Sequence, residues 1–287
     1  MRILYGAGNY IGSNIIASRF LKNAPNHQIK IAGYYRNHKY LNTIDWCLDA
    51  LYQTKFGTKN YFLLKHGVKG PLVNHDIADV IINDILEFEP ELVISDCEIF
   101  TAFVAKALEI PLWYCSPMLQ LVGIEREYRD ILLGTFRKTK EYIASLPEAD
   151  AYLVYSPLCD ILSRPILKNT FEWVRPYYET PVELSTESID FSTFSRALPE
   201  GSLISTGETS FVADCLYSGR SFCVSPNPNE QEQLLNAQLL QYYNVAVNIG
   251  RPRTIEVVKR KVEKKVWKPV LSIQKWKSLD ERIEDGL

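Results

Sequence analysis

The sequence lacks the features that anchor a protein in a membrane or hold it together through metal ions or disulfide bonds. No apolar run reaches the ~18 residues of a transmembrane helix, so we expect no membrane span. The opening segment MRILYGAGNYIG lacks the basic and apolar regions of a signal peptide, which favours a cytoplasmic location. Six cysteines without CxxC spacing and four unclustered histidines predict neither a disulfide framework nor a metal site.

An excess of positive charge is also absent. The net charge is −2, and the apolar fraction of 46% is ordinary for a globular protein, which argues against a globally basic nucleic-acid binder. One local basic run stands out between Arg251 and Lys268, where only Glu256 and Glu263 oppose the cations. Such a run is usually the solvated face of a helix, but it also suits a nucleic-acid backbone or an anionic lipid surface.

Strands and helices alternate along the first half of the chain, which predicts a parallel sheet with helices on both faces. The expected strands are 2–5, 29–34, 92–95, 111–115 and 151–155. The expected helices are 12–21, a short one near 46–52, 76–88, 99–108 and most of 123–143. After a polar stretch at 171–200 the alternation resumes, and the chain closes with helical patterns at 254–266 and 273–283.

The segment 203–238 carries the most chemical information. A short apolar strand at 203–205 leads through a turn at 206–210 into an amphipathic helix that ends near Gly219. Backbone N–H groups and the positive end of the helix dipole converge at such a turn, which makes an anion site. Gly207 allows a phosphate to approach the backbone closely, and Thr209 or Ser210 can cap the helix or bond a phosphate oxygen.

A second glycine-bearing loop, Gly6 to Gly12, follows the first strand and opens a helix. It is similar to the loop of NAD-dependent nucleotide-sugar epimerases and dehydratases, but Asn9 stands where their middle glycine falls and the second strand ends without a ribose-binding acid. The loop can also be a turn needed only for packing. Our preferred interpretation is that Gly8, Asn9 and Tyr10 face an interdomain cleft and help to hold an acceptor.

The segment 203–238 resembles the donor-sugar signature of the GT-B glycosyltransferases, such as UDP-glycosyltransferases and the lipid II-forming N-acetylglucosaminyltransferase. Thr206 stands at the family's histidine, Gly207 at its first glycine and Glu208 at its second. The resemblance implies that Thr206, Gly207, Thr209 and Ser210 meet a diphosphate, that Asp214 holds the ribose, and that Glu232 and Gln233 bond the sugar hydroxyls. The donor it implies is a nucleotide sugar, UDP-linked, with no further cofactor.

Residues 90–112 resemble the acceptor-domain strand, helix and strand of the same family, and 171–176 resembles its crossover strand. The implied fold is α/β, with two Rossmann-like domains facing a cleft and a truncated C-terminal domain. The boundaries we expect are an acceptor domain at 1–175, a donor domain at 176–270, and a C-terminal helix at 271–287 that packs back on the first domain.

The first loop lacks the histidine that serves as base in many relatives, which points to a carboxylate base. Asp96 leads because it ends a central parallel strand, where open α/β sheets present their ligands, and Glu98 is second. The alternative is that Asp96 only caps the helix that begins near Glu98.

The function implied is inverting transfer of a sugar to an acceptor hydroxyl. The compact size resembles phage enzymes that modify DNA, so hydroxymethyl-pyrimidine in duplex DNA, reached through Arg251–Lys268, is one candidate acceptor, with the host cytoplasm as the location. A small metabolite or a lipid-linked acceptor is another. A non-catalytic protein that binds sugar nucleotides is a further alternative.

Overall fold

The computed structural model describes residues 1–35, 40–52, 59–60, 72–123, 136–160, 170–179, 202–250, 254–262 and 276–286. Its main feature is a seven-stranded parallel sheet with the strand order β3-β2-β1-β6-β7-β8-β9. The strands are β1 (Arg2–Gly6), β2 (Gln28–Gly33), β3 (Trp46–Cys47), β6 (Leu92–Ser95), β7 (Leu112–Ser116), β8 (Ala151–Tyr155) and β9 (Phe171–Val174). A short antiparallel pair, β4 (Lys59–Asn60) and β5 (Leu72–Val73), stands apart.

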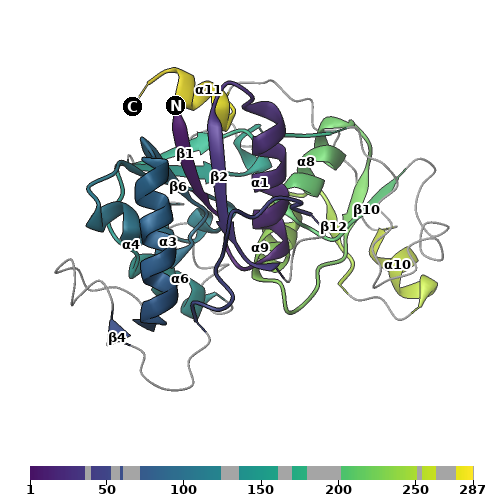
Figure 1. Ribbon diagram of the computed structural model, residues 1–287. Coiled ribbons are helices and arrows are strands. Elements are labelled where there is room, and N and C mark those ends of the chain that lie inside the picture. The colour runs from purple at the N-terminus through teal and green to yellow at the C-terminus, as the bar shows by residue number, and fades with distance from the viewer. Residues whose placement is uncertain are drawn as a thin grey trace.

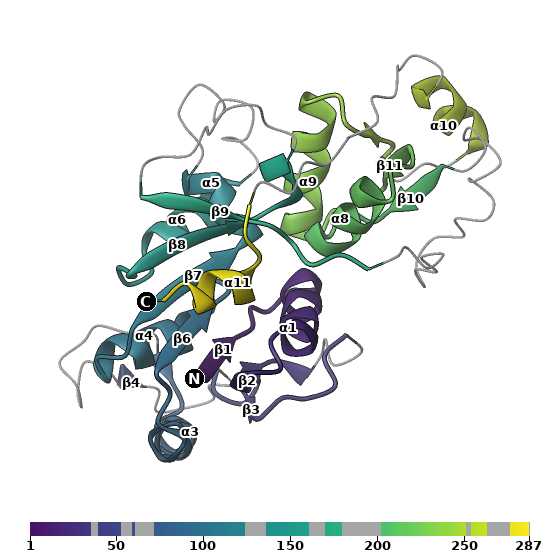
Figure 2. The same ribbon diagram turned by 90° about the horizontal axis from the view of Figure 1, so that it is seen from above.

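Helices cover both faces of this sheet (Figures 1 and 2). They are α1 (Ile11–Asn23), α3 (His75–Phe88), α4 (Ile99–Ala107), α5 (Gln120–Gly123), α6 (Arg137–Ala144) and α11 (Leu279–Glu284). Successive side chains of a strand point to opposite faces. In β1, Ile3 and Tyr5 therefore join one buried cluster with Phe20 of α1 and Leu279 of α11, whereas Leu4 joins the cluster on the other face.

A smaller parallel sheet follows, in the order β10-β11-β12. Its strands are β10 (Leu203–Ser205), β11 (Phe222–Val224) and β12 (Val247–Asn248), and its helices are α8 (Thr209–Tyr217), α9 (Gln231–Tyr242) and α10 (Ile255–Val262). Apolar residues of α8 and α9 share a continuous core with the first sheet, while α10 covers the opposite face through Val258 and Val262. The α/β class predicted from the sequence is confirmed.

One predicted element is wrong. Instead of a helix near 46–52, residues 46–47 form β3, which pairs with β2 through Ala32 opposite Trp46 and Gly33 opposite Cys47. The Asp45 carboxylate accepts a hydrogen bond from Ile31 N at 2.7 Å and fixes this pairing. Sheet pairing therefore decides the conformation of a segment whose local pattern favoured a helix.

Several other expectations fall partly outside the described residues. Residues 124–135 separate α5 from α6, and of the basic run only 254–262 is described.

Residues 171–174 form the outermost strand of the first sheet, next to β8. Helix α11 lies against the first sheet, where Leu279 and Ile283 are buried (Figure 2). Within the described residues, no helix has the length and apolar character needed to cross a bilayer.

Candidate active site

The strand order places the candidate site. From β1 the chain proceeds through β2 to β3 on one side, and β6 then pairs with the other side of β1. In open α/β sheets, ligands bind outside the carboxyl ends of the strands at such a switch point. The segment Gly8–Tyr10 follows β1 and Asp96 follows β6, so both lie at this point.

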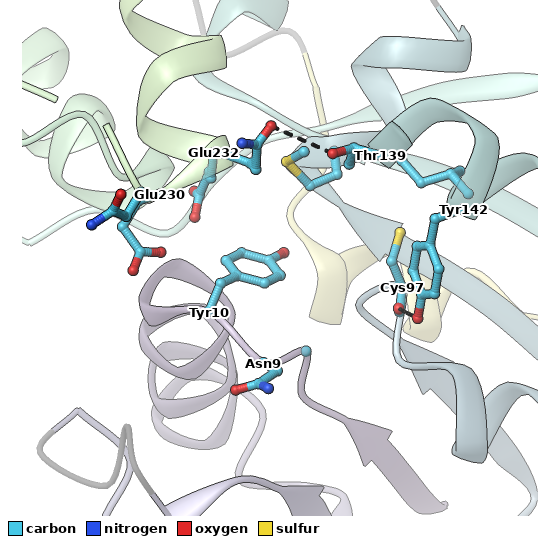
Figure 3. A pocket seen from close by; sticks show the side chains of 12 residues that line it. Asn9, Tyr10, Cys97, Thr139, Tyr142, Glu230 and Glu232 are labelled. Atoms are coloured by element: carbon cyan, nitrogen blue, oxygen red, sulfur yellow. Dashed lines mark hydrogen bonds between the residues drawn. The ribbon is translucent and has the colours of Figure 1, made fainter. Parts of the chain in front are cut away.

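A cavity of about 500 Å³ opens there, within the size range of small-molecule sites (Figure 3). The first sheet's loops and helix α6 form one wall and the start of α9 forms the other. The described residues that line it are Gly8, Asn9, Tyr10, Cys97, Met118, Thr139, Tyr142, Ile143, Asn229, Glu230, Gln231 and Glu232. Thr139 Oγ1 lies 3.4 Å from Gln231 Oε1 and joins the two walls.

Asp96 lies beneath this cavity and is fully buried. Its Oδ1 accepts a hydrogen bond from the hydroxyl of Tyr10, whose oxygen lies 3.3 Å from Ser116 Oγ. Burial raises the pKa of Asp96 to about 6, while hydrogen bonds from Ser116, Tyr10 and Ser13 lower it. A carboxylate with a pKa close to neutrality suits a general base, since it is ionised at pH 7 and still takes a proton readily.

Gly8 allows Tyr10 to reach Asp96. A Cβ atom at Gly8 would lie 2.7 Å from both the Asp96 carbonyl oxygen and the Tyr10 ring. The residue after Asp96, Cys97, has a φ of 53°. Left-handed backbone in a non-glycine residue costs about 1–2 kcal/mol and clusters at functional sites. The two loops therefore hold Asp96 and Tyr10 together at some local cost.

Glu98 has a different place. It is the N-cap of α4, where its carboxylate accepts hydrogen bonds from Phe100 N at 3.1 Å and Thr101 N at 2.7 Å. Its Oε1 also accepts from the hydroxyls of Tyr34 and Tyr52, each at 3.2 Å. The cap of this helix is thus Glu98, and the interpretation of Asp96 as its cap is wrong. With its oxygens committed in this way, Glu98 is a poor candidate for a base.

Glu232 occupies the position that the sequence pattern assigned to a phosphate. It lines the cavity, and its Oε1 accepts a hydrogen bond of 2.8 Å from Thr209 N, the first residue of α8. The free N–H groups and the dipole of a helix N-terminus, which hold this acid group, would also favour a phosphate. A phosphate could therefore bind at Thr209 N only by replacing this internal acid.

We expect Gly12→Ala to destabilise the fold by about 1–2 kcal/mol, because the new Cβ pushes the flexible end of Glu232 away from Thr209 N. Its Cβ would lie 1.6 Å from Glu232 Oε2, and both residues are buried. Chemical denaturation measures this loss. The matched double variant Gly12→Ala/Glu232→Ala removes the obstacle, so its loss should fall short of the sum of the two single losses. Additive losses would show that the contact does not set the cost.

The turn before α8 is held by side chains of α9. Gly207 has a φ of +103°, and a Cβ there would lie 3.0 Å from the Gln233 carbonyl oxygen. Glu208 is buried, accepts a hydrogen bond from the Thr206 hydroxyl, and receives another from Gln233 Nε2 at 2.5 Å. The Glu208 carboxylate therefore turns inward. Gln233 is occupied as well, since its Oε1 accepts from Asn227 N at 2.7 Å.

The free energy of unfolding should fall as pH rises from about 5 to 8. Burial raises the pKa of Glu208 to about 7 and of Glu232 to about 8, so the folded protein holds protons that the unfolded chain releases near pH 4.5. Each of these two groups lowers the free energy of unfolding by up to about 1.4 kcal/mol per pH unit as the pH rises through this window. The fall from each group ends once the pH has passed its pKa in the folded protein. Denaturation at pH 5 and pH 8 measures the fall. Glu232→Gln should reduce the slope, and an unchanged slope would contradict the assignment.

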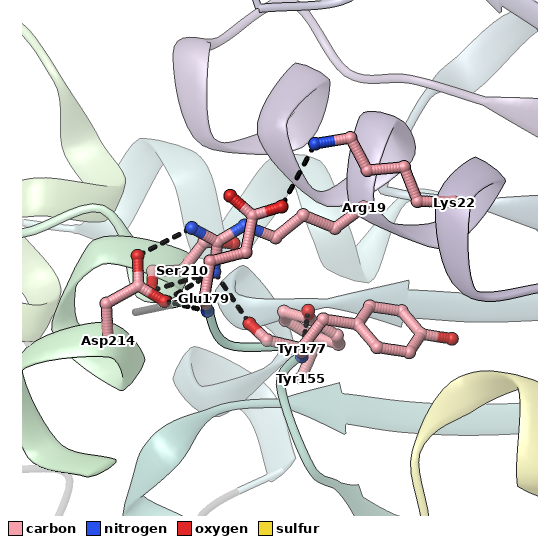
Figure 4. A network of polar contacts seen from close by, with 7 residues as sticks. All are labelled: Arg19, Lys22, Tyr155, Tyr177, Glu179, Ser210 and Asp214. Atoms are coloured by element: carbon pink, nitrogen blue, oxygen red, sulfur yellow. Dashed lines mark hydrogen bonds and ion pairs between the residues drawn. The ribbon is translucent and has the colours of Figure 1, made fainter. Parts of the chain in front are cut away.

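Asp214 lies away from the cavity and faces Arg19 of α1 (Figure 4). Arg19 Nη1 and Nη2 donate to its two oxygens at 2.8 Å and 2.6 Å, and Glu179 N donates to Oδ1 at 2.7 Å. Both side chains are 5% exposed. Because these donors occupy the carboxylate, the expected bond to a ribose diol does not fit this arrangement. Arg19 also donates to the carbonyl oxygens of Tyr177 and Ser210, so it ties α1, the connection between the sheets and α8 together.

The structure thus gathers Gly8, Asn9, Tyr10 and Glu232 around one cavity with Asp96 below it. Outside its described lining lie Glu98, Asp214 and the other predicted donor residues, Thr206, Gly207, Thr209, Ser210 and Gln233. Several residues that line the cavity could not be identified from the sequence, because they belong to no motif that we could interpret. Tyr142 lies on α6, and its hydroxyl donates to the carbonyl oxygen of the neighbouring Cys97 at 3.0 Å, in the same wall of the cavity (Figure 3). Within the described residues no group of three or more His, Cys, Asp or Glu is arranged to hold a metal ion.

Comparison with known proteins gives the fold. No family model matches the chain, and no curated protein matches its sequence. Among solved structures, a glycotransferase of kitacinnamycin is similar with 13% identity and a TM-score of 0.54, over 92% of this chain and 89% of the other. CalG4, the calicheamicin glycosyltransferase, gives 12% identity and 0.52 over 92% and 89%. SsfS6, a glycosyltransferase of Streptomyces sp. SF2575, gives 15% identity and 0.51 over 91% and 90%.

The chain therefore has the GT-B fold of these glycosyltransferases. At such low identity the likeness concerns the fold, and function has to be argued from the site. The comparisons give no support to the resemblance to phage enzymes that modify DNA.

Proposed function

We propose that this protein is a glycosyltransferase that moves a sugar from a nucleotide-sugar donor to an acceptor hydroxyl with inversion at the anomeric carbon. The observation that carries the proposal is the buried Asp96 carboxylate beneath a cavity at the switch point of a GT-B fold. The two walls of this cavity come from the two sheets, which suits a reaction between two substrates held by different parts of the chain.

On the acceptor side, the loop Gly8–Tyr10 positions the hydroxyl that attacks and Asp96 takes its proton. Attack occurs on the face of the sugar opposite the leaving diphosphate, so one base suffices and no covalent sugar–enzyme intermediate forms. The pKa of about 6 at Asp96 fits this role, because the base is ionised before the reaction and protonated after it.

On the donor side, we propose that Thr206, Gly207, Thr209 and Ser210 meet the diphosphate and that Glu232 contacts the sugar. Gln233 joins Glu232 there only by giving up its hydrogen bonds to Glu208 and Asn227 N. The positive ends of α8 and α9 both lie here and favour the charge that develops on the leaving group. Since Glu232 accepts from Thr209 N without a ligand, it moves toward the sugar when a phosphate takes its place. With this assignment we propose an acceptor domain at 1–175, a donor domain at 176–270 and a C-terminal helix at 271–287.

The acceptor we favour is a small hydroxyl compound without a phosphate group. The described lining of the cavity includes two tyrosines, Met118, Ile143 and two glutamates, and no lysine or arginine. Duplex DNA carrying a hydroxymethyl-pyrimidine is the second candidate, because Lys259 and Arg260 of α10 are exposed. A salt-dependent gel shift with duplex DNA separates the two: we expect no shift at physiological salt, and binding that weakens with salt would favour DNA.

A thermal-shift screen with UDP, UDP-, dTDP- and GDP-linked hexoses and NAD tests the donor assignment. Binding to the folded state alone raises stability by about 2.7 kcal/mol at a hundredfold excess over Kd. We expect UDP-linked compounds to raise the Tm. Stabilisation by NAD alone would favour the epimerase or dehydratase, stabilisation by sugar nucleotides without turnover would favour a non-catalytic binding protein, and no stabilisation would contradict the donor site.

A further inference from the structure

The hydroxyl of Tyr10 stands between the cavity and Asp96. Tyr10 lines the cavity, whereas Asp96 is fully buried and is absent from the described lining. In Figure 3 the Tyr10 ring projects into the centre of the cavity. Because the Tyr10 hydroxyl donates a hydrogen bond to Asp96 Oδ1, an acceptor molecule in the cavity meets the phenolic oxygen first.

Several contacts hold Tyr10 in this position. It is the N-cap of α1, with φ −148° and ψ 158°, so its side chain leaves the helix in an extended conformation. Its backbone N donates to the Gly8 carbonyl oxygen at 2.9 Å, and Asn14 Nδ2 donates to the Tyr10 carbonyl oxygen at 3.0 Å. The missing side chain of Gly8 makes room for the ring. The hydroxyl lies near Ser116 Oγ on the side of β7.

We propose, on the basis of the glycosyltransferase function above, that Tyr10 is a catalytic residue that relays the acceptor's proton to Asp96. As the acceptor oxygen bonds to the anomeric carbon, its O–H bond breaks and the proton passes to the phenolic oxygen of Tyr10. The proton already on Tyr10 passes to Asp96 Oδ1 in the same step. The bond from the anomeric carbon to the diphosphate breaks, and its electron pair leaves with the diphosphate.

Tyr10 returns to a neutral phenol and Asp96 ends protonated, so the charges balance. The two transfers are concerted, because burial and the nearby Asp96 and Glu232 raise the pKa of Tyr10 well above its usual value and disfavour a free tyrosinate. The titratable groups around Asp96 are Tyr10 just before α1, Tyr5 from β1, Cys97 from the loop after β6, Cys115 from β7 and Glu232 from α9.

The test compares Tyr10→Phe, Asp96→Asn and the double variant. The probe is the hexose nucleotide that stabilises the wild type most, with release of nucleoside diphosphate as the readout and water as the acceptor. We expect Tyr10→Phe to lower kcat by about 100-fold or more, in the range of proton-transfer catalysis, with the Kd for the nucleotide within about threefold. Since both groups move the same proton, the double variant should lose no more than the worse single variant. If Tyr10 had only a structural role, the kcat loss of the double variant would be the product of the two single losses.

Tyr114→Phe is the matched control. It removes a tyrosine hydroxyl from β7 of the main sheet, but that hydroxyl bonds the Pro147 carbonyl oxygen at 2.9 Å and Tyr114 does not line the cavity. Its kcat should stay within about threefold of wild type. If Tyr10→Phe keeps full kcat while Asp96→Asn loses it, the relay is wrong and the transferase function stands. If the wild type neither binds nor cleaves any nucleotide sugar, both proposals fall together.

Discussion

Replacing Arg19 with methionine is expected to lower the free energy of unfolding by about 3–5 kcal/mol, the usual cost of breaking a buried ion pair from one side. The substitution leaves the Asp214 carboxylate buried with one remaining donor, Glu179 N, in place of three. It also removes the donors to the carbonyl oxygens of Tyr177 and Ser210, so α1 loses its polar contacts to α8. Urea denaturation followed by tryptophan fluorescence measures the change.

Two variants make this result specific. Lys22 lies on the same helix as Arg19, and Lys22→Met breaks its ion pair with Glu179. Because these side chains are 62% and 52% exposed, we expect the free energy of unfolding to fall by less than about 1 kcal/mol. Arg19→Met/Asp214→Leu removes both charges, and much of the stability should return, since apolar replacements of buried ion pairs are often neutral. If Arg19→Met lies within about 1 kcal/mol of wild type, the pair does not hold the two sheets together.

Replacing Asp96 with asparagine is expected to lower kcat by about 10²–10⁴-fold, the contribution of a positioned general base. The change preserves shape, and the amide oxygen can still accept from the Tyr10 hydroxyl, so the nucleotide Kd should stay within about threefold. Steady-state kinetics with the hexose nucleotide chosen by the thermal-shift screen, together with calorimetric titration, separates the two quantities. An Asp96→Asn variant with full kcat would remove Asp96 from the mechanism.

Glu98→Gln is the control, because it neutralises an equally buried carboxylate only two residues away. Its oxygens cap α4 and accept from tyrosine hydroxyls. We expect about 1–2 kcal/mol of lost stability from the weakened cap, and a kcat within about threefold of wild type. A kcat that falls as far as in Asp96→Asn would mean that the two acids act together.

The main sheet could be predicted because its strands are short apolar runs bounded by residues that interrupt regular structure. Leu92–Ser95, for example, follows Pro90 and is buried on both faces, as central parallel strands are. The position of Asp96 at the carboxyl end of β6 follows from the same pattern. Residues 46–47 could not be predicted in this way, because their conformation comes from pairing with β2 and not from local preference.

The partners of Asp214 could not be predicted either. Arg19 and Asp214 are 195 residues apart, and only the packing of α1 against α8 brings them together. From the sequence alone, Arg19 is interpreted as a solvated cation on a helix. Asp214 is interpreted by its spacing, which matches a position of the family. Glu208 shows the same limit: sequence places a carboxylate beside an anion site, but only the structure turns it toward Thr206 and Gln233.

The most direct measurement is release of nucleoside diphosphate by the wild-type protein from a panel of UDP-, dTDP- and GDP-linked hexoses, compared with Asp96→Asn. Chromatography of the reaction mixture quantifies the nucleotide, and NMR of the released or transferred sugar gives its anomeric configuration. We expect release by the wild type with inversion, and at least a hundredfold slower release by a variant that still binds the donor. No release from any donor by a folded wild-type protein, or equal release by the variant, would contradict it.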